Sequence, residues 1–336
     1  MEVKQMKRKL FYGRNHSLQS VVVEPRGEQK GGYWIIYIHG GAWRDPRIIA
    51  ESFQTTQSIL EADPNLPISG FASINYRLSA SAKFPQDQDT TSPEDYRNAR
   101  HPDHIRDVEA ALAFLQNTYD FGQRYILVGH SCGATLAFQA VMGAIAGHRE
   151  QLSDKGTNDC DVDTEPVSSS PEPLPPRLAA LPAAIIGVAG IYDLRAIVES
   201  HREIPEYRQF VEAAFGSDET VWDAVSPAQM VGSRGVEGGW KTGRLAMLVH
   251  SDDDELVERA QLEAMRECLR AWEGREAQIE KEELSSRERR VKILAISGAH
   301  DDAWKKGEEL ARAISLTFSE LSEMGLSPKS AARPRF

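Results

Sequence analysis

Hydrophobic positions follow two alternating patterns along this chain of 336 residues. Short, nearly continuous apolar runs rich in β-branched residues are typical of strands that are covered on both faces. Between them lie longer segments in which apolar residues recur every three or four positions, as on one face of a helix. The predicted strands are residues 21–23, 34–38, 71–76, 125–128, 184–188, 245–249 and 291–296.

The longer segments predict helices between these strands. One apolar face is formed by Ile105, Val108, Leu112 and Leu115, and a second, near the C-terminus, by Leu310, Ile314, Phe318 and Leu321. Strands that alternate with helices indicate an α/β fold with a mostly parallel central sheet flanked by helices. We find no internal repeat.

Two regions depart from this alternation. Residues 150–178 hold five Pro and seven acidic against two basic residues, a composition that cannot build a core, so we expect a flexible surface insertion. Residues 258–290 carry charges of both signs at helical spacing and predict an exposed helix that is interrupted near Gly274. We therefore expect one domain over 1–336 that contains the 150–178 insertion.

The net charge of the chain limits the kinds of partner that it is expected to bind. With 39 Lys and Arg against 50 Asp and Glu, the net charge is −11, which argues against binding to nucleic acid or to anionic membranes. The longest uncharged apolar stretch, 179–192, is too short to span a bilayer. The N-terminus has no apolar block typical of a signal peptide, and Cys132, Cys160 and Cys268 have no CxxC spacing. These features predict a cytoplasmic location.

The sharpest motif is Gly-His-Ser-Cys-Gly at 129–133, which matches G-x-S-x-G. A predicted strand comes before it and a good helix-forming segment, 134–141, follows it. A nucleophile elbow needs this strand–turn–helix setting, with glycines where a Cβ would clash. We interpret Ser131 as a nucleophile; the alternative is an ordinary glycine turn.

A second motif, His-Gly-Gly-Ala-Trp at 39–43, directly follows the predicted strand 34–38. Glycines at a strand end allow backbone N–H groups to face a cavity, as an oxyanion hole requires. We assign the donors to the N–H groups of Gly41, Ala42 and Cys132, and expect His39 to brace the loop without acting in catalysis. The alternative is again a simple glycine turn.

A serine nucleophile needs a histidine base, which in this type of fold comes last along the chain. Of His148, His201, His250 and His300, only His300 follows the last predicted strand, in a glycine-containing loop from which it can reach the elbow. A surface histidine is the alternative interpretation.

The orienting acid should lie in the loop after the strand 245–249, where four acidic residues stand together at 252–255. We rank Asp254 first, because it immediately precedes a helix expected to start at Glu255, and Asp253 second. The remaining carboxylates are expected to cap that helix.

No metal or other cofactor is expected. The nine histidines include no H-x-x-x-H or H-E-x-x-H pair on a helix. His101 and His104 lie three residues apart, but around a proline at an expected helix start.

Several motifs together resemble those of the serine-dependent kynurenine formamidases of eukaryotes, in particular of fungi, which are α/β-hydrolases with an HGGxW loop. The resemblance covers about 33–140, 183–228 and 245–318, and its most discriminating residue is Trp43, where related esterases usually have glycine. The 150–178 insertion and the charged extension before 290 depart from it. The motifs are HGGAW at 39–43, NYRLS at 75–79, GHSCGA at 129–134, GIYDL at 190–194, HSDDDELV at 250–257 and GAHDD at 298–302.

The resemblance implies hydrolysis of N-formyl-L-kynurenine to L-kynurenine and formate, a step of tryptophan degradation that feeds NAD biosynthesis. It maps the triad to Ser131, Asp254 and His300 and two oxyanion donors to Gly41 and Ala42. It also suggests a homodimer. Trp43 and Tyr192 are candidates for contact with the aromatic ring of the substrate, with core packing as the alternative.

Two other functions stay open at this stage. A carboxylesterase of the hormone-sensitive-lipase type would use the same triad on short esters. A non-catalytic α/β-hydrolase that binds a ligand is the more remote alternative, since such proteins usually lose the nucleophile or the base.

Overall fold

A computed structural model describes residues 6–26, 31–143, 178–274 and 288–327. Eight strands of these ranges form one sheet in the order β1-β2-β4-β3-β5-β6-β7-β8. The pairs β1–β2 and β2–β4 are antiparallel, and the other neighbours are parallel, which confirms the mostly parallel sheet. The strands are β1 (Arg8–Phe11), β2 (Ser20–Pro25), β3 (Tyr33–Ile38), β4 (Ile68–Ile74), β5 (Tyr125–His130), β6 (Ala184–Val188), β7 (Leu245–Ser251) and β8 (Arg290–Ile296).

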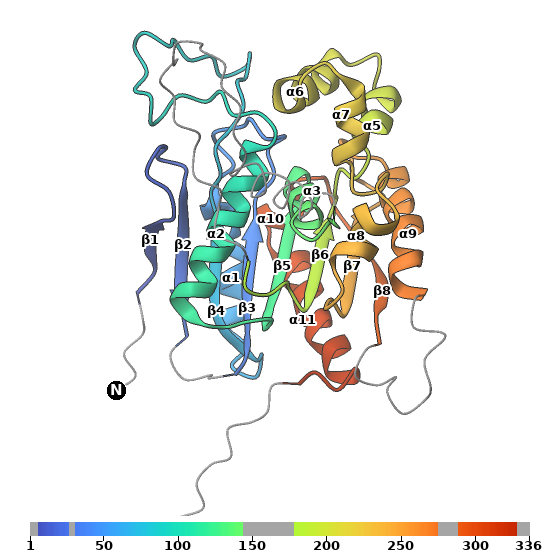
Figure 1. Cartoon of the computed structure of the whole chain (residues 1–336). Helices are drawn as coiled ribbons and strands as arrows, with labels where there is room; N and C mark the ends of the chain where they lie inside the picture. Colours follow the sequence, from blue (N-terminus) through green and yellow to red (C-terminus); the bar gives the residue numbers. More distant parts are fainter. Residues whose placement is uncertain (1–5, 27–30, 144–177, 275–287, 328–336) are drawn as a thin grey trace, which may run out of the picture.

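Helices cover both faces of the sheet (Figure 1). One layer consists of α2 (Asp103–Tyr119), α3 (Cys132–Gln139), α8 (Val236–Gly239) and α9 (Arg259–Gly274). The opposite layer consists of α1 (Gln54–Glu61), α10 (Asp302–Lys305) and α11 (Glu308–Glu323). The helices predicted around 105–115, 134–141 and 310–321 are confirmed as α2, α3 and α11.

The continuous apolar runs of the strands follow from these two layers. In β3, Trp34 and Ile36 join the core beneath α2, α3 and α9, whereas Ile35 and Tyr37 join the core beneath α1 and α11. Alternate residues of a strand point to opposite faces, so a sheet covered on both sides needs apolar residues at every position.

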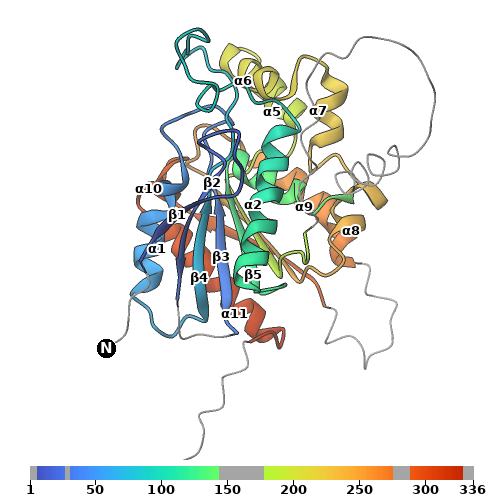
Figure 2. The same cartoon turned by 60° about the vertical axis from the view of Figure 1, so that its left-hand side comes forward.

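A cap of three helices lies over the edge of the sheet at which the parallel strands end (Figures 1 and 2). It consists of α5 (Leu194–Ser200), α6 (Pro205–Phe215) and α7 (Glu219–Val225). Asp193 caps α5 by accepting a hydrogen bond from the Ala196 N–H at 2.9 Å. Arg195 joins α5 to α7 through ion pairs with Glu219 and Asp223. The short 3-10 helices η1 (Ala50–Phe53) and η2 (Gly232–Arg234) complete the regular structure of the described residues.

The structure differs from the sequence predictions at several places, and the strand predicted at 71–76 is β4, Ile68–Ile74. The edge strand β1 was not predicted, because its four residues are mostly exposed. The helix expected to start at Glu255 begins at Arg259, since the Asp254 side chain accepts the N–H groups of Leu256 and Val257 and holds the chain in a turn.

Two expectations concern residues that are only partly described. The proposed insertion 150–178 lies outside the described residues except for Leu178, and of the predicted 258–290 helix the structure describes α9, which ends at Gly274. Each helix within the described ranges is too short or too polar to cross a bilayer.

Candidate active site

Ser131 stands on a sharp turn between β5 and α3. Its φ of 53° lies in the left-handed region, which a residue with a side chain rarely adopts unless its surroundings enforce it. A Cβ added to Gly129 would meet the Gly133 carbonyl, and one added to Gly133 would meet the Ile38 carbonyl. The predicted strand–turn–helix setting is thus present, and its glycines are required sterically.

His300 and Asp254 form a direct pair at the ends of neighbouring strands β8 and β7. The Nδ1 atom of His300 lies 2.8 and 3.0 Å from the two carboxylate oxygens of Asp254, and both side chains are buried. Burial alone would raise the pKa of Asp254, but hydrogen bonds from His300 and from the N–H groups of Val257 and Leu256 lower it. The carboxylate is therefore held ionised beside the imidazole.

The other acidic residues of this loop are placed differently. Asp253 accepts a long hydrogen bond from the Gly298 N–H at 3.4 Å, and Asp252 pairs with Arg259 at the surface. Neither contacts the His300 ring in the part of the chain that the structure describes. Of the two candidates ranked from the sequence, Asp254 is the one next to His300.

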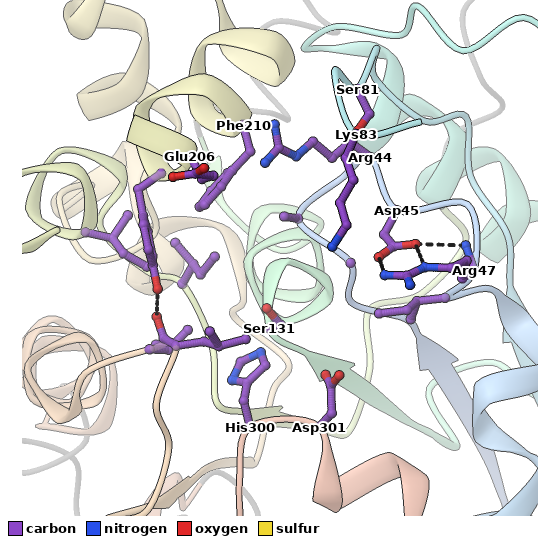
Figure 3. A pocket seen from close by; sticks show the side chains of 18 of the residues that line it. Arg44, Asp45, Arg47, Ser81, Lys83, Ser131, Glu206, Phe210, His300 and Asp301 are labelled. Carbon is purple, nitrogen blue, oxygen red and sulfur yellow. Dashed lines mark hydrogen bonds and ion pairs between the residues drawn. The ribbon is translucent and has the colours of Figure 1, made fainter. Parts of the chain in front are cut away.

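Ser131 and His300 line the same open pocket of about 370 Å³ beneath the cap. In Figure 3 the Ser131 hydroxyl lies next to the His300 ring, with Asp301 beside it. The structure thus brings Ser131, His300 and Asp254 together from three separate loops at the carboxyl ends of β5, β8 and β7.

The loop after β3 has an unusual backbone. Gly41, Ala42 and Trp43 have successive φ values of 97°, 49° and 58°. The N–H groups of Arg44 and Asp45 both donate to the Gly41 carbonyl, at 3.0 and 2.9 Å, which closes the turn. Gly41 and Ala42 line the pocket together with Ser131, as an oxyanion loop would.

The Cys132 thiol is hydrogen-bonded to this loop. Its sulfur accepts a hydrogen bond from the Trp43 N–H at 3.3 Å and lies 3.5 Å from the Tyr76 hydroxyl, which donates to the His39 carbonyl at 3.0 Å. Burial raises the pKa of the thiol to about 11, so the sulfur stays protonated.

His39 supports the loop without reaching the pocket. Its ring stacks on that of Tyr76 at 4.4 Å between centroids, and burial lowers its pKa to about 4, so it is neutral at pH 7. Gly40 leaves room for His130, because an added Cβ would lie 2.8 Å from His130 Nδ1. His39 is thus placed against the loop and outside the pocket lining, and its bracing role stays a prediction.

Trp43 and Tyr192 do not line the pocket. Both are buried, and Trp43 packs edge-on against Phe215 with ring centroids 5.0 Å apart. Core packing, which was the alternative interpretation, therefore describes them, and Trp43 fixes the loop to the cap.

His104, His201 and His250 do not line this pocket. His201 pairs with Glu258 at 3.0 Å, His250 is buried outside the pocket lining, and His104 is buried against the Ser79 hydroxyl. His148 falls outside the described residues.

One group of possible metal ligands occurs among the described residues, formed by His130, His300 and Asp301, whose donor atoms lie within 4.8 Å of one another. Two of the ring nitrogens are already engaged, since His130 Nε2 contacts the His300 carbonyl and His300 Nδ1 contacts Asp254. The Asp301 carboxylate accepts from Trp304 and pairs with Lys305.

Sequence reasoning missed four residues of the site. His130 lies behind His300, and three charged side chains, those of Arg44, Lys83 and Glu206, line the pocket. The only signal for two of them was position: His130 precedes the serine in its motif, and Arg44 follows HGGAW directly.

The sequence of the chain is similar to a hydrolase family model and to fungal relatives. Residues 35–284 match the model of the alpha/beta hydrolase family. The chain is 38% identical over 303 residues to the kynurenine formamidase-like hydrolase fscH of Fusarium equiseti, with 90% of this chain and 88% of that one covered. It is 36% identical over 294 residues to the kynurenine formamidase avaC of Aspergillus versicolor, with 82% and 85% covered.

Solved structures resemble the chain in fold. Esterase B from Lactobacillus rhamnosis aligns with a TM-score of 0.60 at 15% identity, covering 96% of this chain and 86% of that one. A hyperthermophilic esterase from Pyrobaculum calidifontis aligns with a TM-score of 0.56 at 12% identity, covering 96% and 87%. With the family match and the two fungal relatives, these findings establish that the chain belongs to the alpha/beta hydrolase family, and within it to the fungal kynurenine formamidases and formamidase-like hydrolases.

Proposed function

We propose that this chain hydrolyses N-formyl-L-kynurenine to L-kynurenine and formate, with Ser131 as nucleophile, His300 as general base and acid, and Asp254 as the orienting carboxylate. The observation that carries the proposal is the placement of Ser131 and the Asp254-bound His300 on one pocket wall. The kynurenine formamidase names of relatives at 36–38% identity support the substrate.

The reaction begins when His300 Nε2 removes the proton of the Ser131 hydroxyl, whose oxygen attacks the formyl carbon. Asp254 keeps the proton of His300 on Nδ1, so that Nε2 faces the serine as the acceptor, and stabilises the imidazolium that forms. The negative charge on the former carbonyl oxygen is stabilised by the N–H groups of Gly41, Ala42 and Cys132. Each such donor contributes about 3 kcal/mol to lowering the barrier.

Breakdown of the tetrahedral intermediate cleaves the C–N bond. His300 gives its proton to the leaving aryl nitrogen, which departs as the amine of L-kynurenine and leaves the formyl group as an ester on Ser131. A water molecule that loses a proton to His300 then attacks this ester, and formate is released as the Ser131 hydroxyl regains its proton. No group besides the chain and water is needed for this sequence.

The proposal is tested by comparing kcat/KM of the wild-type protein for N-formyl-L-kynurenine and for a short aryl ester such as phenyl acetate. We expect the formamide to be preferred. A strong preference for the ester, with no turnover of the formamide, would assign the site to a general esterase instead.

Assembly as a homodimer and a cytoplasmic location remain predictions.

A further inference from the structure

The pocket has an apolar floor and a charged rim. Between Ser131 and the cap, the wall is formed by Ile191, Ile197, Tyr207 and Phe210. Glu206 stands beside Phe210, and on the other side of the pocket lie Arg44, Lys83 and the Asp45–Arg47 pair (Figure 3). A pocket that only held a formyl group and an aromatic ring would not require the charges at the rim.

The Asp45–Arg47 pair is neutralised within itself. Arg47 donates to both carboxylate oxygens of Asp45 at 3.0 and 2.7 Å, so neither side chain carries an unbalanced charge toward the pocket. This bidentate arrangement is the geometry that guanidinium and carboxylate prefer.

Arg44 and Lys83 make no direct ion pair among the residues that the structure describes; burial lowers the pKa of Arg44, and the nearby charges of Glu206 and Asp45 partly offset this. Instead, the Arg44 guanidinium lies over the Phe210 ring, 5.7 Å from its centroid, and the Lys83 ammonium lies 5.8 Å from the centroid of Phe84. Arg44 is half-buried, and since Glu206 and Asp45 act on it only from a distance, an anionic ligand would supply the direct partner that a partly buried arginine favours. The two cations therefore make a site for an anion at the pocket rim.

Of the three acidic side chains that line the pocket, Asp45 pairs with Arg47 and Asp301 with Lys305, and the third, Glu206, complements these cations. It stands in the first turn of α6 on the cap, makes no direct ion pair within the described ranges, and acts on Arg44 through its charge. A rim with two cations on one side and one carboxylate on the other matches a zwitterion, whose carboxylate and ammonium would be bound separately.

The cation site is linked to the reaction centre through the backbone of the loop after β3. The Arg44 N–H donates to the Gly41 carbonyl at 3.0 Å, so the guanidinium and the expected oxyanion donors belong to one turn. A ligand held by Arg44 is thus bound beside the loop that lines the reaction centre, which favours a reactive geometry.

Resting on the proposed function, we propose that this rim binds the α-amino-acid group of the substrate. Arg44 and Lys83 bind its α-carboxylate, and Glu206 binds its α-ammonium. The site thereby selects formylated arylamines that carry a zwitterionic α-amino acid. The aromatic ring lies between these charges and Ser131, against the apolar wall.

The test compares N-formyl-L-kynurenine with 2′-formamidoacetophenone, which keeps the ring, the ketone and the formamide but has no amino-acid group. Arg44→Met and Lys83→Met should each raise KM for N-formyl-L-kynurenine on the order of tenfold or more, as expected for loss of a charged hydrogen bond. Glu206→Gln should raise it less, since Glu206 is exposed. KM for the acetophenone should stay close to the wild-type value, which also shows that each variant is folded.

Arg202→Met serves as the matched control, because Arg202 is an exposed cap cation, paired with Glu199, that does not line the pocket. This variant should leave KM for both N-formyl-L-kynurenine and 2′-formamidoacetophenone at the wild-type value.

Inhibition by L-kynurenine and by 2′-aminoacetophenone, measured with phenyl acetate as substrate, gives a second readout that does not depend on formamide cleavage. The cation variants should weaken inhibition by L-kynurenine alone.

The outcomes separate the two proposals. If the wild type cleaves both formamides with equal efficiency and the variants leave that ratio unchanged, the zwitterion site is wrong while the formamidase function stands. If the wild type cleaves phenyl acetate but neither formamide, the proposed function is wrong. In that case, inhibition of phenyl acetate hydrolysis by L-kynurenine but not by 2′-aminoacetophenone would still support the zwitterion site. Equal inhibition by both amines would show that the zwitterion site is wrong as well.

Discussion

His130 Nε2 lies 3.0 Å from the carbonyl oxygen of His300, and the two imidazole rings pack with their centroids 4.7 Å apart. Burial and the neighbouring His300 lower the pKa of His130 far below its ordinary value, so His130 is neutral and its Nε2–H donates to that carbonyl. The residue before the proposed nucleophile, Ser131, thus holds the backbone of His300, the proposed base.

Replacing His130 by alanine should therefore misplace His300. We expect His130→Ala to lower kcat by about tenfold, the equivalent of one lost hydrogen bond, with little change in KM. His130→Gln, whose side-chain N–H₂ can reach the same carbonyl, should retain most of the activity. Equal losses in both variants would show that packing of the ring, rather than its donor, is what matters.

The role of Asp254 can be tested with Asp253, in the same loop, as the control. Asp254→Asn should lower kcat by about 10⁴-fold, since an amide can hold His300 in the wrong tautomer and cannot stabilise its cation. Asp253→Asn should leave kcat near the wild-type value, because Asp253 makes only a long contact to the Gly298 N–H. Steady-state kinetics on both variants would contradict the triad assignment if the two effects were reversed.

The thiol next to the nucleophile should be unreactive in the folded protein. Cys132 is fully buried and its pKa is raised to about 11, so almost no thiolate is present at neutral pH. We expect no loss of activity when the native enzyme is treated with iodoacetamide, and alkylation of Cys132 only after unfolding, as measured by peptide mass spectrometry. Rapid native alkylation of Cys132 would show that the loop opens.

Buried neutral histidines make stability depend on pH. Burial lowers the pKa of His39 to about 4 and that of His104 to about 3. The unfolded chain binds protons at these residues below about pH 6.5 while the folded chain does not, so the free energy of unfolding decreases as pH falls from about 6.5 to about 4. Each residue contributes a slope of up to about 1.4 kcal/mol per pH unit in that window.

Urea unfolding of the wild type and of His104→Gln at pH 7 and pH 5 measures this slope. The variant is expected to be less stable at pH 7 but to lose less stability on acidification. An identical pH dependence in both proteins would show that His104 is not the neutral buried group described above.

The alternation of strands and helices and the elbow were predictable because each depends on local sequence. Strand 125–128 and Ser131 are adjacent in the chain, so their geometry follows from the residues between them. His300 was predictable because parallel strands end at one edge of the sheet, which collects their loops.

Other features depend on contacts between distant segments. The choice of Asp254 over Asp253 rests on the side-chain direction within a turn, and the start of α9 at Arg259 follows from the same turn. The role of His130 depends on a carbonyl that is 170 residues away. The charged rim is assembled from the loop after β3, the loop after β4 and the cap, and no local pattern connects these three segments.

The central claim is that Ser131 cleaves N-formyl-L-kynurenine. It is tested most directly by following the absorbance of L-kynurenine during hydrolysis by wild type and by Ser131→Ala, with the urea unfolding of both proteins measured in parallel. The account predicts rapid release of L-kynurenine by the wild type and loss of at least about 10³-fold in kcat in an equally stable variant. Undiminished turnover by Ser131→Ala, or no turnover by the wild type, would contradict it.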